Sequence, residues 1–204
     1  MLDHCPLGWL LAGWDGLLSF VMTRKSFFSL LIALGFAWRL FVGSRMVVPR
    51  EDGVNYLWMA ERFAEGEVVT ALSEVFSPLL ALLIAIPVAL GLEPFFAGQL
   101  VLALAGSLVV LPIAAISEHL APGTERVAAL LTFVAARLVL LGAEVYTEPL
   151  FVCLGSYAFL LGLRRQFAVC GLMVGLAFWV RPEAALIAVV FLGRVRARWL
   201  PLLG

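Results

Sequence analysis

The sequence has few charged residues. Only 14% of its 204 residues are charged, whereas 63% are hydrophobic. A soluble domain carries about 25% charged residues to cover its surface. Here the charges are clustered, and long apolar runs lie between the clusters. A helix needs about 20 apolar residues to cross a bilayer, so the chain has room for about five crossings. The composition excludes a soluble domain and predicts an all-α, polytopic transmembrane helix bundle.

Residues that hold metals, disulfides or nucleic acid are also scarce. The three cysteines are Cys5, Cys153 and Cys170, and the two histidines, His4 and His119, lie far apart. Their spacing fits neither a disulfide framework nor a zinc site. The formal net charge is +0, so no nucleic-acid partner is indicated. We therefore expect no metal and no cofactor.

The apolar runs divide the chain into three parts. Residues 1–25 form an N-terminal interfacial or cytoplasmic segment, because its apolar stretch is interrupted by glycines and Asp15. Residues 26–193 form the transmembrane module, with an outer loop at 49–77. Residues 194–204 form a basic cytoplasmic tail. Within the module, Leu79–Leu92 is short for a crossing, and we expect it to dip into the membrane and return.

The outer loop is the most polar part of the chain. Val54, Leu57, Trp58 and Phe63 recur in it at nearly helical spacing, and Gly66 suits the end of a helix. This pattern predicts an amphipathic helix that lies on the membrane surface. On this interpretation Tyr56, Trp58 and Phe63 are interfacial anchors.

Basic residues near the span ends set the orientation. The set expected in the cytoplasm comprises Arg24, Lys25, Arg126, Arg164, Arg165, Arg194, Arg196 and Arg198. This predicts a multi-pass protein of a bacterial inner membrane, or an equivalent one, with a cytoplasmic N-terminus. Three acidic interruptions, near Asp52, Glu148 and Glu183, then share the opposite face.

These three interruptions carry residues suited to one kind of chemistry. A carboxylate beside a wet cavity can act as a general base. An arginine such as Arg181 can hold a phosphate through charge-assisted hydrogen bonds. Together they suit transfer of a group from a lipid phosphate to a hydroxyl.

The order of the motifs resembles the N-terminal half of the GT-C superfamily of polyprenyl-phosphate-dependent glycosyltransferases. Protein mannosyltransferases (glycosyltransferase family 39) and aminoarabinose transferases are the most similar groups. The motifs that match are Asp52…Tyr56 after the first span, Ser77-Pro78, Thr147-Glu148, Gly171-Leu172 with Gly175-Leu176-Ala177, and Arg181-Pro182-Glu183. The resemblance covers Phe27 to about Leu192. Gly53 departs from it, because many relatives have Glu there, and so does Gln99, which stands near a frequent Arg.

The resemblance implies an inverting transfer of a hexose such as mannose to a hydroxyl on the non-cytoplasmic face. Asp52 would be the catalytic base. Arg181, Glu183, Glu148 and Tyr56 would bind the phosphate or line the cavity. The partners implied are a polyprenyl-phosphate-linked sugar and membrane lipids. Family members are longer, so we expect a partner subunit to supply the missing C-terminal half, or a chain that is inactive because it is truncated.

Each motif also has a purely structural interpretation. Asp52 can cap the following helix, Thr147-Glu148-Pro149 can start one, and Arg181-Pro182-Glu183 can break one. Gly171 and Gly175 have the spacing of closely packed helices. The alternative function is a non-catalytic scaffold subunit or a small transporter. Arg39 and Arg137 lie inside apolar runs, where charged residues often mark a transport path, so a transporter function is retained as an alternative. Arg39 either snorkels, faces a wet bundle interior or lies on a substrate path.

Overall fold

The computed structural model describes residues 23–46, 48–49, 51–72 and 75–190, and every regular element in these ranges is a helix. The elements are α2 (Arg24–Gly43), α3 (Glu51–Ala64), α4 (Val68–Ala71), α5 (Pro78–Ala89), α6 (Pro94–Leu108), α7 (Val110–Leu120), α8 (Glu125–Val134), α9 (Ala136–Ala143), α10 (Glu148–Leu163), α11 (Phe167–Phe178) and the 3₁₀ turn η1 (Pro182–Ala184). The prediction of an all-α protein is confirmed for this part of the chain. The predicted N-terminal segment and basic tail lie almost wholly outside these ranges.

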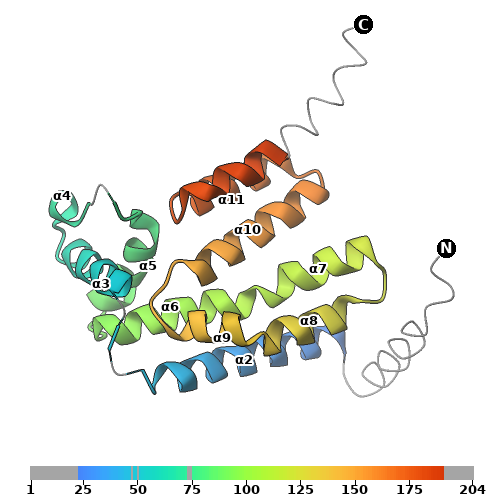
Figure 1. Ribbon diagram of the computed structural model, residues 1–204, viewed down its shortest axis with the longest axis horizontal. Helices are drawn as coiled ribbons and strands as arrows, with labels where there is room; N and C mark the ends of the chain where they lie inside the picture. Colours follow the sequence, from blue (N-terminus) through green and yellow to red (C-terminus); the bar gives the residue numbers. More distant parts are fainter. Residues whose placement is uncertain (1–22, 47, 50, 73–74, 191–204) are drawn as a thin grey trace, which may run out of the picture.

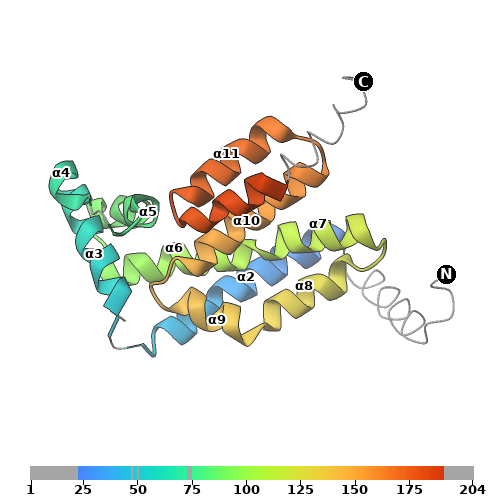
Figure 2. The ribbon, with the colours of Figure 1, turned by 45° about the horizontal axis from the view of Figure 1, so that its top comes forward.

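The long helices run side by side. In Figures 1 and 2, α2, the α6–α7 rod and the α8–α9 pair lie alongside one another, and the α10–α11 hairpin packs beside them. The short helices α3, α4 and α5 gather at one end of this bundle. The bundle end that holds them is called the α3 end below, and the opposite one the α7–α8 end.

Two helices in the described ranges are long and apolar enough to cross a membrane, namely Arg24–Gly43 and Pro94–Leu120. The second corresponds to α6 and α7 together. Pro112 lacks the amide that would bond to Leu108, which accounts for the irregular turn at Val109. Glu93 caps the start of α6 by accepting hydrogen bonds from the amides of Phe95 and Phe96 at 2.9 and 2.7 Å.

The apolar run at residues 127–141 is bent in the structure. Helices α8 and α9 meet at 54° around Ala135, and the pair counts as a third span only if both halves are taken together. The hydroxyl of Thr132 donates to the carbonyl of Ala128 at 2.7 Å, one turn before the bend. Such backbone contacts by a threonine often bend helices.

The predicted amphipathic helix is present as α3, and Gly66 follows it with φ +83, as the sequence indicates. Only some of its apolar residues are buried within the protein. Tyr56, Met59 and Ala60 pack into the core with Leu57, whereas Val54 and Trp58 are exposed. Tyr56 is therefore not an interfacial anchor. Its ring lies beneath the surface, because α3 packs against α5 and α6.

Arg39 lies in the centre of the bundle and is fully buried. Because it is 0% exposed, its side chain does not snorkel. Its Nη1 donates to the carbonyl of Gly35 at 3.0 Å, and its side chain passes against Gly106 of α6 and Gly142 of α9. Its Nε and Nη2 have no partner in the described part of the chain. Glycines at these positions let three helices close around one arginine.

The predicted close packing at Gly171 and Gly175 is not found. A Cβ atom at either position would meet no atom of the described chain within 4 Å. The glycines that do permit close approach are Gly98, Gly106 and Gly142, where an added Cβ would lie within 3.0 Å of a neighbouring side chain.

Candidate functional site

A cavity of about 370 Å³ opens at the α3 end of the bundle. It is lined by parts of α3, the segment 75–77, the segment 146–148 and the segment 180–183. The residues singled out from the sequence all line it, namely Asp52, Tyr56, Glu148, Arg181 and Glu183. Segments more than a hundred residues apart in the chain thus meet around one hollow. The large apolar core lies directly behind it, with Tyr56, Val145 and Val180 among its members.

Asp52 is exposed and stands in the first turn of α3. Because α3 begins at Glu51, Asp52 is the second residue of the helix and does not occupy the N-cap position. A carboxylate in a first turn is stabilised by the helix dipole. Asp52 is therefore a charged group at the rim of the cavity, and capping does not account for it.

Tyr56 lies one turn after Asp52, so the two side chains share a face of α3. Its side chain is 6% exposed, and its ring meets Phe76 edge to face with centroids 5.3 Å apart. Burial raises the pKa of Tyr56, and the nearby carboxylate of Asp52 raises it further. The phenol therefore stays protonated at neutral pH and can donate a hydrogen bond into the cavity.

Arg181 is held between two carboxylates. Its Nη1 donates to Glu148 Oε1 at 2.8 Å, and its Nη2 donates to Glu183 Oε1 at 3.2 Å. The hydrogen bond to Glu183 is the main cause that raises the pKa of Arg181. Conversely, the pKa of Glu183 is lowered by a hydrogen bond from its own backbone and by the one from Arg181. The Arg181 guanidinium carbon also lies 6.0 Å from the centroid of the Phe151 ring.

Glu148 both starts a helix and contributes its carboxylate to the cavity. Helix α10 starts at this residue, with Thr147 before it and Pro149 in the first turn, as the structural interpretation of the motif predicts. The side chain of Glu148 nevertheless reaches the cavity and binds Arg181. Its second oxygen, Oε2, is buried and has no hydrogen-bond partner among the described residues. That oxygen is free to accept a hydrogen bond from a bound hydroxyl.

The sequence Arg181-Pro182-Glu183 likewise interrupts the helical structure and places side chains in the cavity. Helix α11 ends at Phe178, and a 3₁₀ turn begins at Pro182. The hairpin of α10 and α11 carries this turn back to the α3 end, as Figure 1 shows. The backbone amide of Leu79 donates to the carbonyl of Trp179 at 3.3 Å, which ties the end of α11 to the start of α5.

Two glycines hold the segment before Glu148 in place. A Cβ atom at Gly53 would lie 3.1 Å from the carbonyl oxygen of Val145, and one at Gly98 would lie 2.9 Å from the Val145 side chain. Val145 is 2% exposed, so it is clamped between α3 and α6. Gly53, where the resemblance predicts Glu in many relatives, has no room for a longer side chain.

Gln99 has a role away from the cavity. It is 5% exposed, and its Nε2 donates to the carbonyl of Gly43 at 2.9 Å. This carbonyl at the C-terminus of α2 also accepts a hydrogen bond from the backbone amide of Met46 at 2.8 Å. The residue that replaces the expected arginine thus joins α2 to α6.

No role in the site was predicted for Ser77, Tyr146 or Thr147, although all three line the cavity. Their hydroxyls add neutral hydrogen-bonding groups to a site whose other polar groups are charged. The signal was present, since Tyr146 and Thr147 directly precede Glu148 and Ser77 precedes Pro78.

No group of three potential metal ligands occurs among the residues that the structure describes. The expected lack of a metal or cofactor stays a prediction. The chain matches no protein-family model, and it matches neither a curated protein nor a solved structure.

Proposed function

We propose that this chain is a membrane glycosyltransferase, or the N-terminal part of one, that takes a sugar from a polyprenyl-phosphate donor. The acceptor is a hydroxyl, and the transfer inverts the sugar. The observation that carries the proposal is the cavity at the α3 end. It gathers a base candidate, a phosphate-binding candidate and several hydroxyl groups, although they come from four separate segments.

The chemical step assigns one role to each group. The acceptor oxygen attacks the anomeric carbon of the donor sugar while its proton passes to the carboxylate of Asp52. The bond between the anomeric carbon and the phosphate oxygen breaks. The lipid phosphate leaves with the bonding electrons, and the configuration at the sugar inverts. Tyr56 and the free oxygen of Glu148 orient the bound hydroxyl groups.

Arg181 binds the donor phosphate after one of its present partners moves. Glu183 is the partner that yields, because its side chain is 52% exposed and its hydrogen bond is the longer of the two. The phosphate then takes its place on Nη2. Glu148 keeps Nη1 and so fixes the orientation of the guanidinium. The carboxylate of Glu183 thus occupies the phosphate position when no donor is bound.

The distribution of charge supports the orientation proposed for the cavity. The α7–α8 end carries five described cations, Arg24, Lys25, Arg126, Arg164 and Arg165, and only two carboxylates, Glu118 and Glu125. The α3 end is mainly acidic. Because basic residues favour the cytoplasmic side, we propose that the α7–α8 end faces the cytoplasm and the cavity faces away from it. The N-terminus of α2 then lies on the cytoplasmic side.

A transfer assay with membranes that contain the full chain tests the proposal. Asp52→Asn removes the base and keeps the shape of the side chain, and we expect loss of turnover by 10²-fold or more, roughly the contribution of a general base. Glu51→Gln is the matched control, because Glu51 is an exposed neighbour in the same turn that does not line the cavity. Its turnover should equal that of the wild type. Full activity of Asp52→Asn would refute the assigned base.

The alternative is a non-catalytic scaffold subunit, and one observation favours it. Arg181 is already neutralised by Glu148 and Glu183, as in an ion cluster that only ties helices together. The same transfer assay, combined with a measurement of the unfolding temperature, distinguishes the glycosyltransferase from the scaffold. A wild-type chain that turns over no polyprenyl-phosphate sugar, yet unfolds at a lower temperature after Arg181→Gln, is a scaffold. The transporter alternative has less support, since Arg39 is fully buried with its side chain packed against α6 and α9.

A further inference from the structure

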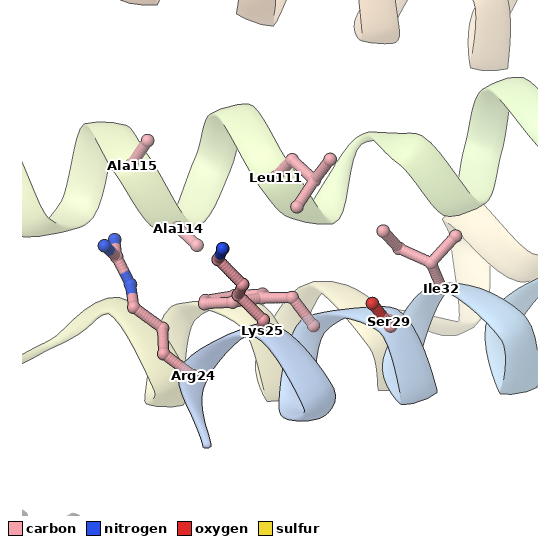
Figure 3. A pocket seen from close by; sticks show the side chains of 8 residues that line it. Arg24, Lys25, Ser29, Ile32, Leu111, Ala114 and Ala115 are labelled. Carbon is pink, nitrogen blue, oxygen red and sulfur yellow. The ribbon is translucent and has the colours of Figure 1, made fainter.

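A second cavity lies at the α7–α8 end, between α2 and α7, and has a volume of about 480 Å³. Figure 3 shows Arg24, Lys25, Ser29 and Ile32 on α2 facing Leu111 and Ala114 on α7. Lys25, Ser29 and Ile32 follow one another at intervals of four and three residues, so they form one stripe along α2. Both helices belong to segments long enough to cross a membrane.

The polarity of this cavity changes along its length. Arg24 and Lys25 are the first two residues of α2, and Ser29 lies about 6 Å deeper along the helix axis than Lys25. Ile32 lies about 10 Å deeper than Lys25. The α7 wall is apolar, with Leu111 and Ala114. The cavity is thus cationic at its mouth, has one hydroxyl in the middle and is apolar at its inner end.

The cations at the mouth are not neutralised equally. Arg24 forms an ion pair with Glu125 of α8, and its guanidinium carbon lies 6.0 Å from the centroid of the Phe28 ring. Lys25 is exposed and pairs with no acid in the part of the chain that the structure describes. None of the described residues that line the cavity carries a carboxylate. The other described carboxylate at this end, Glu118, accepts a hydrogen bond from the amide of Gly123.

We propose that this cavity binds one anionic phospholipid. The lipid phosphate pairs with the ammonium group of Lys25 and accepts a hydrogen bond from the Ser29 hydroxyl. One acyl chain lies along the apolar wall beside Ile32 and Leu111. An anionic lipid fits better than a zwitterionic one, because the positive charge of Lys25 at the mouth has no acidic partner among the residues that the structure describes. A free phosphate would leave the apolar half of the cavity empty.

The proposal depends on α2 and α6–α7 lying in a bilayer and is independent of glycosyl transfer. It places the charged mouth at the level of the lipid headgroups, where basic pockets between membrane helices select anionic lipids. It therefore stands or falls separately from the activity proposed for the first cavity.

Native mass spectrometry of the full-length protein, purified in detergent and titrated with phosphatidylglycerol or phosphatidylcholine, tests it. We expect the wild type to retain one phosphatidylglycerol with clear preference over phosphatidylcholine. Lys25→Gln should weaken phosphatidylglycerol binding about five-fold, the effect of one basic residue at a lipid surface, and Lys25→Arg should restore it. Ser29→Phe keeps both cations but fills the exposed middle of the cavity, and it should abolish the preference.

Arg45→Gln is the matched control. Arg45 is an exposed cation just after the opposite end of α2, so its loss removes the same charge without touching the cavity. Equal retention of the two lipids by the wild type would overturn the proposal. An equal loss of binding in Arg45→Gln and Lys25→Gln would also overturn it, because it would show only general attraction. Displacement of the lipid by inorganic phosphate at equal concentration would identify a free-anion site instead.

Discussion

The close contact between Gly106 and Arg39 predicts that adding a methyl group at position 106 lowers the stability of the protein. In Gly106→Ala the new Cβ would lie 2.8 Å from Arg39 Nε and 3.3 Å from Arg39 Cδ. The arginine has little room to move away, because it is 0% exposed and its Cδ already lies so close to Gly142 of α9 that a Cβ built there would be 2.8 Å from it. One of the helices α2, α6 or α9 must therefore shift.

Forcing an extra methyl group into a filled interior costs about 1–3 kcal/mol. Since the site is closed on both sides, we expect a cost in the upper half of that range. Alanine gains about 1 kcal/mol over glycine in a helix, which offsets part of it. The net loss is then about 1–2 kcal/mol in the free energy of unfolding. For a chain of this size that loss corresponds to a fall of roughly 2–8 °C in the unfolding midpoint.

The buried cysteines provide the assay. Cys153 and Cys170 are both buried and free, so a thiol-reactive fluorophore reports unfolding in detergent as they become accessible. The Gly106→Ala substitution is measured in the wild type and in the Arg39→Ala background, where the obstructing side chain is absent. We expect its cost to disappear in that background. Gly171→Ala is the control, since a Cβ there meets nothing within 4 Å and its midpoint should not fall. An equal cost of Gly106→Ala in both backgrounds would refute the reasoning.

Three further predictions concern the cavity at the α3 end and its support. Gly53→Glu should lower the unfolding midpoint and the activity together, because the new side chain would collide with the Val145 carbonyl, and purified protein that keeps wild-type values would contradict this. Gln99→Leu should destabilise the chain by about 1 kcal/mol by removing the hydrogen bond that joins α6 to the end of α2, as measured by the same fluorophore assay, while the Gly43 carbonyl keeps its bond from the Met46 amide. The Arg181–Glu183 pair should stabilise the fold fully above pH 4.5, the ordinary pKa of Glu183, and lose its effect as the pH falls through the lowered pKa. The difference in midpoint between wild type and Glu183→Gln across pH measures it, and a difference that stays constant on acidification would be evidence against it.

The sequence predicted those features that depend on local pattern. The helices begin and end near prolines, glycines and charges that mark such boundaries, as at Glu93-Pro94 and Gly66. The grouping of Asp52, Glu148 and Arg181 was predicted from the alternation of apolar runs and polar breaks. A chain that crosses back and forth must bring alternate breaks to the same end.

Features that depend on contacts between distant segments were not predictable. The Gly171 and Gly175 spacing is the one associated with close packing, yet both positions face open space. Gly106 and Gly142 carry no such local spacing, and they close on Arg39 because α6 and α9 happen to flank α2. The burial of Tyr56 has the same origin, since α5 covers one side of α3.

The bend between α8 and α9 also escaped prediction. No proline or glycine marks the bend. The residues next to Ala135 are mostly apolar, so the sequence predicted a continuous run. The residues named from the resemblance to polyprenyl-phosphate glycosyltransferases line one cavity, but the resemblance did not indicate that position 53 lies against the Val145 carbonyl.

The unequal lengths of the two spanning helices have a consequence for how the protein sits in lipid. Helix α2 has 20 residues and is about 30 Å long, which matches the hydrocarbon layer, whereas Pro94–Leu120 has 27 residues and is about 40 Å long. The surplus of about 10 Å either tilts the rod or lifts the start of α6 into the headgroup region. A thicker bilayer would draw that end inward and bring the rim of the cavity at the α3 end closer to the acyl chains. Membrane thickness would thereby set the depth of this cavity relative to the lipid headgroups.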